Sequence, residues 1–192
     1  MDAYLVSTLL VALAEMGDRT QLLAIMLASR YRQAAPILLG ILVATLANHY
    51  LAALAGFYLS KLLSAVWFRY AISASFITMA LWALIPDKEA DEEKANRPRL
   101  GVFITTAVSF FLVEIGDKTQ IATAALAARF HDVVLVAAGT TTGMMVANIP
   151  AVFLGHRVTR VLPIGMLRVA AALVYFALGI RGLAVTMGLF QS

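Results

Sequence analysis

Residues 15–21 read EMGDRTQ, and residues 114–120 read EIGDKTQ, so one charged heptapeptide occurs twice in the chain. The copies lie 99 residues apart, and the same ungapped offset also aligns Arg30 with Arg129 and Gly40 with Gly139. Self-similarity at a fixed offset is the signature of an internal structural repeat. The sequence therefore predicts two similar halves, at residues 1–86 and 100–192, joined by a charged linker at 87–99.

Apolar residues dominate the composition. Of the 192 residues, 61% are hydrophobic and 14% are charged, well beyond the apolar share of a soluble domain. The apolar runs are about 20 residues long or longer, enough for a helix to cross a hydrocarbon core of ~30 Å. They lack the alternation of barrel strands, so helices are expected. The sequence predicts an all-α membrane protein with six transmembrane helices, at about 3–28, 34–60, 65–86, 100–127, 132–156 and 164–188.

The number of helices in each half determines how the halves are related. Because three is odd, the second half enters the membrane from the opposite side, which predicts two inverted-topology three-helix repeats. Most basic loop residues fall on one side, and this bias marks the cytoplasmic face. The chain is therefore predicted to be multi-pass in the cell inner (plasma) membrane, with both termini extracytoplasmic and membrane lipid around it. The extracytoplasmic side carries only Lys61, Arg69, Arg129 and Arg181.

Composition also excludes several classes of function. The chain has no Cys, so it has no disulfide framework, and any metal site must use oxygen or nitrogen ligands. The net charge of +4 is not gathered into a dense basic tract with interleaved aromatics, so no nucleic-acid partner is expected. The sequence does not distinguish a monomer from a homo-oligomer.

The repeated motif places acidic residues near mid-membrane, where one charged side chain costs about 2.5–3.5 kcal/mol on insertion scales. The three-residue spacing puts Glu15, Asp18 and Gln21 on one helical face, and the second copy does the same. If the two helices meet, four carboxylates and two amide oxygens form a site for a hard cation. With the neighbouring threonine hydroxyls included, the candidate ligands are Glu15, Asp18, Thr20, Gln21, Glu114, Asp117, Thr119 and Gln120.

Other residues of the motif and its surroundings refine this hypothesis. Gly17 and Gly116 permit either close helix approach or local unwinding that frees backbone carbonyls. With Arg19 and Lys118, four carboxylates and two bases sum to −2, which one divalent ion or two protons would neutralise. Weaker candidate ligands at similar depth are Asn48, His49 and Asn148.

Several rival readings of the doubled motif remain. Its charges could simply join helices through salt bridges. An intramembrane aspartyl hydrolase has little reason for an adjacent base and two extra Glu residues, so no enzyme is expected. A cation channel could use the same carboxylates without coupling to protons. An exporter of a basic organic solute could also use them.

The paired E-x-G-D-[KR]-[ST] motifs resemble those of the Golgi-type calcium/manganese cation:proton antiporter family, whose bacterial members are manganese exporters. The resemblance covers nearly the whole chain. It implies that Glu15, Asp18, Glu114 and Asp117 bind the ion, assisted by the Thr and Gln residues that follow. It also implies a secondary transporter that exports Mn²⁺, or alternatively Ca²⁺, in exchange for protons. The ion is cargo, and no resident cofactor is expected.

Overall fold

The computed structural model describes residues 2–62, 66–85, 101–154 and 164–189, and the predicted linker at 87–99 lies outside them. Within this part of the chain, all regular secondary structure is α-helical, which confirms the predicted all-α class. The helices are α1 (Asp2–Glu15), α2 (Arg19–Tyr31), α3 (Ala34–Leu62), α4 (Val66–Ala83), α5 (Gly101–Glu114), α6 (Lys118–Phe130), α7 (Val133–Leu154) and α9 (Ile164–Thr186).

By length and composition, four of the described helices can cross a membrane. These candidate spans are Ala34–Lys61, Val66–Ala83, Val133–Leu154 and Val169–Thr186, and α5 is a shorter apolar helix. Large apolar side chains cover the outer surface, with Leu81, Leu112 and Leu173 each more than 60% exposed. An outer surface of this kind is expected where lipid replaces water. The chain is therefore a multi-pass membrane protein.

The helices predicted over 3–28 and 100–127 are each interrupted at the repeated motif, between α1 and α2 and between α5 and α6. Gly17 has φ +83° and Gly116 has φ +76°, in the left-handed region where a Cβ is unfavourable. Of the two roles open to these glycines, the structure shows local unwinding.

The interruption corrects one step of the sequence analysis. Glu15 is the last residue of α1, Asp18 is the N-cap of α2, and Gln21 lies in the first turn of α2. The expectation that these three residues share one face of a continuous helix is therefore wrong. Helical spacing does not apply across a break, and the turn itself now positions the side chains.

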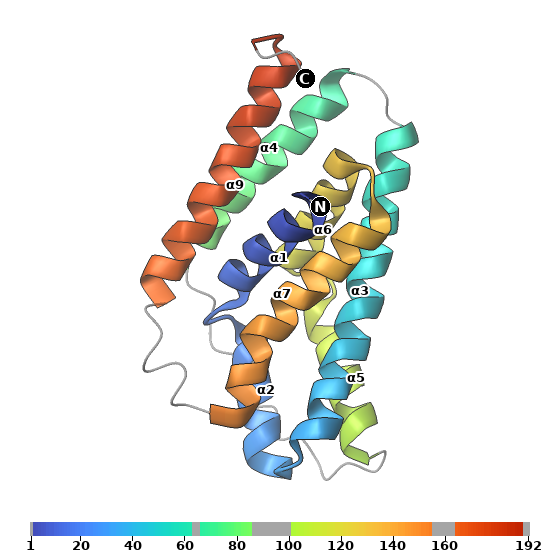
Figure 1. The fold of residues 1–192 in the computed structure, drawn as a ribbon, viewed down its shortest axis with the longest axis vertical. Coiled ribbons are helices and arrows are strands. Elements are labelled where there is room, and N and C mark those ends of the chain that lie inside the picture. Colours follow the sequence, from blue (N-terminus) through green and yellow to red (C-terminus); the bar gives the residue numbers. More distant parts are fainter. Residues whose placement is uncertain (1, 63–65, 86–100, 155–163, 190–192) are drawn as a thin grey trace.

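The sequence repeat is also a repeat of local structure. Each of α5, α6 and α7 begins 99 residues after α1, α2 and α3, respectively. The residues that cap α2 and α6, Arg32 and His131, both adopt left-handed conformations, with φ of 53° and 54°. Figure 1 shows that α1 and α2 run down the molecule, whereas α5 and α6 run up it. The two interrupted segments are therefore antiparallel.

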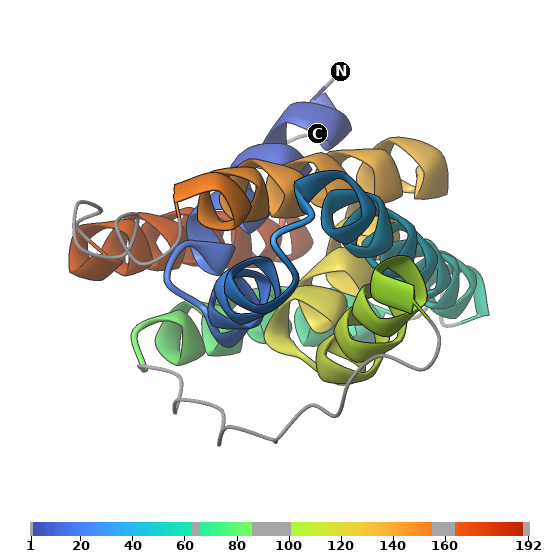
Figure 2. The ribbon, with the colours of Figure 1, turned by 90° about the horizontal axis from the view of Figure 1, so that it is seen from below.

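The packing of the helices brings both halves together. α1 packs on α7, α3 contacts α5, α6 and α7, and α4 pairs with α9 along one edge (Figure 1). Seen from below, α2, α3 and α5 point their ends toward the viewer while α7 runs across the view, so residues of both halves form this end (Figure 2).

Small residues permit the close contact of α1 with α7. A Cβ at Gly139 would lie 2.6 Å from the Tyr4 carbonyl oxygen, and one at Gly143 would lie 2.5 Å from the Thr8 carbonyl oxygen. The spacing Gly139-x-x-x-Gly143 therefore permits close packing of α7 on α1.

Candidate metal site

Three buried carboxylates meet where the two interrupted segments cross. Glu15, Asp18 and Asp117 each offer an oxygen, and these oxygens all lie within 4.8 Å of one another. The residues are only 0%, 2% and 4% exposed. Ligands on opposite sides of a Ca²⁺ ion lie about 4.6–5.2 Å apart, twice the usual metal–oxygen distance. The three oxygens are therefore close enough to share one divalent ion.

Two ion pairs connect the halves at this group. Lys118 Nζ lies 2.6 Å from Asp18 Oδ1, and Arg19 Nη2 lies 2.8 Å from Asp117 Oδ1. Each base thus pairs with the aspartate of the other motif copy. The pairs differ in burial, because the side chain of Lys118 is 8% exposed and that of Arg19 is 37% exposed. The sequence predicts that these charges take part in the cluster, but it does not predict that each base pairs with the aspartate of the other copy.

The carboxylate of Glu15 is satisfied on one oxygen only. Thr20 Oγ1 donates a hydrogen bond of 2.6 Å to Glu15 Oε2. Glu15 Oε1 is buried and, among the described residues, has no hydrogen-bond donor. A buried carboxylate oxygen without a donor is costly, and a bound cation would compensate for it.

Thr119 occupies the position of Thr20 in the second copy and makes a different contact. Its backbone N–H and its hydroxyl both donate to Asp117 Oδ2, at 3.5 and 3.1 Å. Asp117 caps α6 in this way. The N-termini of α2 and α6 both reach the carboxylate group, and their positive ends stabilise negative charge there.

The two glutamines support the chain breaks. Gln21 Oε1 accepts a hydrogen bond from the Gly17 N–H at 2.9 Å, and Gln120 Oε1 accepts one from the Gly116 N–H at 2.8 Å. Gln21 Nε2 also donates to the Ala147 carbonyl oxygen of α7 at 2.9 Å. In this structure, the amide oxygens predicted as ligands therefore hold the turns that carry the carboxylates.

Glu114 is buried but stands apart from the three-carboxylate group. Its oxygens accept hydrogen bonds from two α3 side chains, Thr45 at 3.0 Å and Asn48 at 3.5 Å. Asn48 also donates to the Phe111 carbonyl oxygen at 3.0 Å. Sequence reasoning missed Thr45, although its position three residues before Asn48 places both on one face of α3.

The remaining weak candidates, His49 and Asn148, occupy equivalent positions of α3 and α7. Both are buried, at 1% and 0% exposure. Asn148 Nδ2 donates to the Met144 carbonyl oxygen at 3.0 Å. Neither ring nitrogen of His49 has a hydrogen-bond partner in the described part of the chain, nor does Asn148 Oδ1. Within that part, His49 does not join the group of potential metal ligands.

Two antiparallel, interrupted segments that meet at a buried acidic centre are typical of membrane transporters that bind ions. The family described as "Divalent cation/proton antiporter GDT1" matches residues 3–91 and 102–188, segments that begin 99 residues apart. The chain belongs to this family, which confirms the resemblance found in its motifs.

A protein of Vibrio cholerae serotype O1 (strain ATCC 39541 / Classical Ogawa 395 / O395) named "Putative manganese exporter" is 46% identical to the chain over 173 residues. The alignment covers 90% of this chain and 86% of the relative. No solved structure matches the chain. The family and the relative are transporters, and they support cation transport by this chain.

Proposed function

We propose that this protein exports Mn²⁺ from the cytoplasm in exchange for protons, with Ca²⁺ as the alternative ion. The observation that carries the proposal is the group of three buried carboxylates, Glu15, Asp18 and Asp117, contributed by both halves. The family supports divalent cation transport, and the name of the relative favours manganese.

The proposed membrane arrangement has six spans in two inverted-topology repeats. In it, α1 with α2 and α5 with α6 each form one interrupted span, while α3, α4, α7 and α9 contribute the other four. The antiparallel course of the interrupted segments and the recurring element boundaries support this arrangement. With the cytoplasmic face assigned from the basic residues, both termini lie outside the cytoplasm, and the membrane is the cell inner membrane.

The reciprocal ion pairs suggest how ion binding is coupled to movement. An ion shared by Asp18 and Asp117 would come close to the Lys118 and Arg19 side chains. At a separation of about 4 Å and an effective dielectric constant of about 20, a divalent ion and a monovalent cation repel by about 8 kcal/mol. Binding therefore requires both bases to leave their direct contacts with the aspartates, although they stay in the cluster and in its charge count. Because each pair joins the two halves, breaking both pairs frees the halves to move relative to each other.

The charge count favours exchange over simple binding. Glu15, Asp18, Asp117 and the nearby Glu114, with the two bases, carry a formal charge of −2. One divalent ion or two protons would neutralise it, and neutral states cross a medium of low dielectric at least cost. Alternate loading with an ion and with protons then accounts for antiport.

The other predicted ligands are assigned proposed roles around this centre. Thr20 and Thr119 orient carboxylates and offer hydroxyl oxygens, while Gln21 and Gln120 offer amide oxygens when the breaks rearrange. Glu114 binds the ion after its carboxylate has left the hydrogen bonds from Thr45 and Asn48 of α3. The secondary ligand candidates are Asn48, His49 and Asn148.

Reconstituted vesicles test the proposed function. Metal-driven proton movement is measured with Mn²⁺, Ca²⁺ and Mg²⁺ in parallel, for the wild type, for Asp18→Asn and for the exposed control Asp2→Asn. We expect proton movement with Mn²⁺ in the wild type and the control, and none in Asp18→Asn. Metal flux without proton movement would show a channel instead, and competition by lysine would show an exporter of basic organic solutes.

A further inference from the structure

A cavity lies away from the carboxylate group, between α4, α6 and α9. Its volume is about 1020 Å³, and its lining includes three arginines, Arg69, Arg129 and Arg181. These are three of the four basic residues that the sequence analysis assigned to the extracytoplasmic side. The fourth, Lys61, is not part of the lining, and its ammonium group lies 4.2 Å from the centroid of the Phe57 ring.

The three guanidinium groups gather positive charge in this cavity. In the described residues, none of them forms an ion pair with a carboxylate. Arg129 is half-buried, and its one hydrogen bond to the described chain goes to the Leu178 carbonyl oxygen, at 3.3 Å. The positive charges of Arg129 and Arg181 also act on each other. Cations gathered in this way attract an anion, and guanidinium groups match the geometry of phosphate especially well.

The rest of the wall is apolar and reaches the outer surface. Ile72, Phe176, Ile180 and Val185 line the cavity. Phe176 is 49% exposed and Ile180 is 46% exposed, on the surface that faces lipid. The cavity therefore combines cationic groups with an apolar wall that is accessible from the bilayer. These features fit an amphipathic anion better than a free inorganic one.

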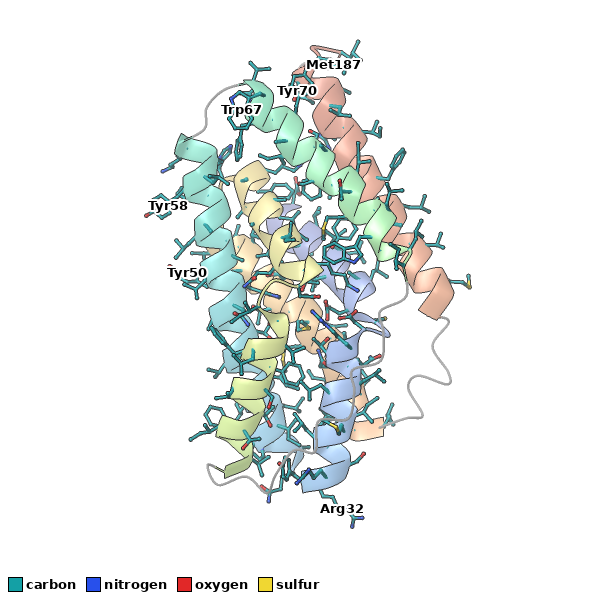
Figure 3. The ribbon with its side chains drawn as sticks, turned by 180° about the vertical axis from the view of Figure 1, so that it is seen from behind. Arg32, Tyr50, Tyr58, Trp67, Tyr70 and Met187 are labelled. Atoms are coloured by element: carbon teal, nitrogen blue, oxygen red, sulfur yellow. The ribbon has the colours of Figure 1, made fainter. Side chains whose placement is uncertain are left out.

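The position of the cavity fits the headgroup level of the membrane. Arg69 lies between Trp67 and Tyr70 in the first turns of α4, and Figure 3 shows both aromatic residues at one end of the molecule. Trp and Tyr concentrate at this level in membrane proteins. Three positive charges would repel a divalent cation, so this cavity is not suited to a path for the transported ion.

We propose that this cavity binds an anionic phospholipid, with the phosphate held by Arg69, Arg129 and Arg181 and an acyl chain along Phe176 and Ile180. The leaflet rests on the proposed topology and is the extracytoplasmic one. Because α6 begins at Lys118 and ends beside Arg129, the lipid attaches α4 and α9 to the helix that begins at the ion pair with Asp18.

Lipid titration of the purified full-length protein tests this proposal. In an uncharged maltoside detergent, dioctanoyl-phosphatidylglycerol, dioctanoyl-phosphatidylcholine and inorganic phosphate are added separately, and binding is followed by native mass spectrometry and thermal unfolding. We expect selective binding of phosphatidylglycerol by the wild type. Arg69→Gln with Arg181→Gln should weaken it by about tenfold or more, because two charge-assisted contacts are lost. Both arginines are exposed, so folding should survive.

Two further variants sharpen the test. Lys61→Gln removes a basic residue on the same side but outside the cavity, and it should bind phosphatidylglycerol as the wild type does. Arg181→Lys keeps the charge but not the planar guanidinium group, and it should bind with intermediate affinity. Equal binding of phosphatidylcholine, full binding by the double glutamine variant, or equally strong binding of inorganic phosphate would each overturn the proposal.

Discussion

Lys118 Nζ lies 2.6 Å from Asp18 Oδ1, so the base of the second motif neutralises an acid of the first. Arg19 and Asp117 form the matching pair in the opposite sense. This crossed pairing joins the two halves at the carboxylates proposed to bind the ion. It also makes the bases competitors of the ion, and the first prediction follows from that competition.

Replacement of Lys118 by Met should destabilise the protein and make it more responsive to metal. Breaking a buried ion pair from one side costs about 3–5 kcal/mol, because the remaining charge stays buried. Mn²⁺ can then replace the lost positive charge without displacing an ammonium group. Thermal unfolding in detergent should therefore show a lower Tm without metal and a larger rise with MnCl₂ than in the wild type. Lys118→Arg, which keeps the charge, is the matched control. Equal metal responses in Lys118→Met and the wild type would contradict the competition.

The two ion pairs should differ in their effect on stability. The side chain of Arg19 is 37% exposed and that of Lys118 is 8% exposed, so solvent screens the Arg19 pair more. Arg19→Gln should therefore lower the Tm less than Lys118→Gln does. Both variants are compared in the same detergent without metal. A larger loss for Arg19→Gln would show that burial does not determine the strength of these pairs.

Single neutralisation of the site carboxylates should abolish transport, and the two glutamate variants should also spare folding. Glu15→Gln, Asp18→Asn, Glu114→Gln and Asp117→Asn each remove one buried charge with almost no change in volume. Levels of Glu15→Gln and Glu114→Gln should stay near those of the wild type, whereas Asp18→Asn and Asp117→Asn each remove an ion pair and should lower the Tm. Cells carrying any of the four variants should lose resistance to added Mn²⁺. Wild-type resistance in any two of these variants would mean that the motif is structural.

The break before α6 should depend on the backbone of Gly116. A Cβ at this position would meet nothing within 4 Å, so Gly116→Ala tests the conformation and not a steric contact. At φ +76°, a residue with a side chain costs roughly 1–2 kcal/mol, and Asn tolerates this region better than Ala does. We expect Gly116→Ala to lower the Tm and slow transport, with a smaller effect for Gly116→Asn. Equal behaviour of Ala and Asn would argue against the left-handed turn.

The sequence predicted the features that depend on composition and local pattern. Apolar runs indicated the all-α class, and Gly17 and Gly116 marked the possible unwinding. It did not predict how the motif folds, because the spacing of Glu15 and Asp18 defines a shared face only in a continuous helix. It also did not predict that Glu114 accepts a hydrogen bond from Thr45 of α3. This contact depends on packing between segments far apart in the chain, which no local sequence pattern indicates.

Anomalous diffraction from crystals grown with Mn²⁺ tests whether carboxylates of both halves share one ion. We expect a manganese peak about 2.0–2.6 Å from carboxylate oxygens of Glu15, Asp18 and Asp117, with the Lys118 ammonium group moved away from Asp18. Asp18→Asn crystals should lack the peak or show it weakened. A manganese peak bound by residues of one half only, or one located with both ion pairs intact, would contradict the account.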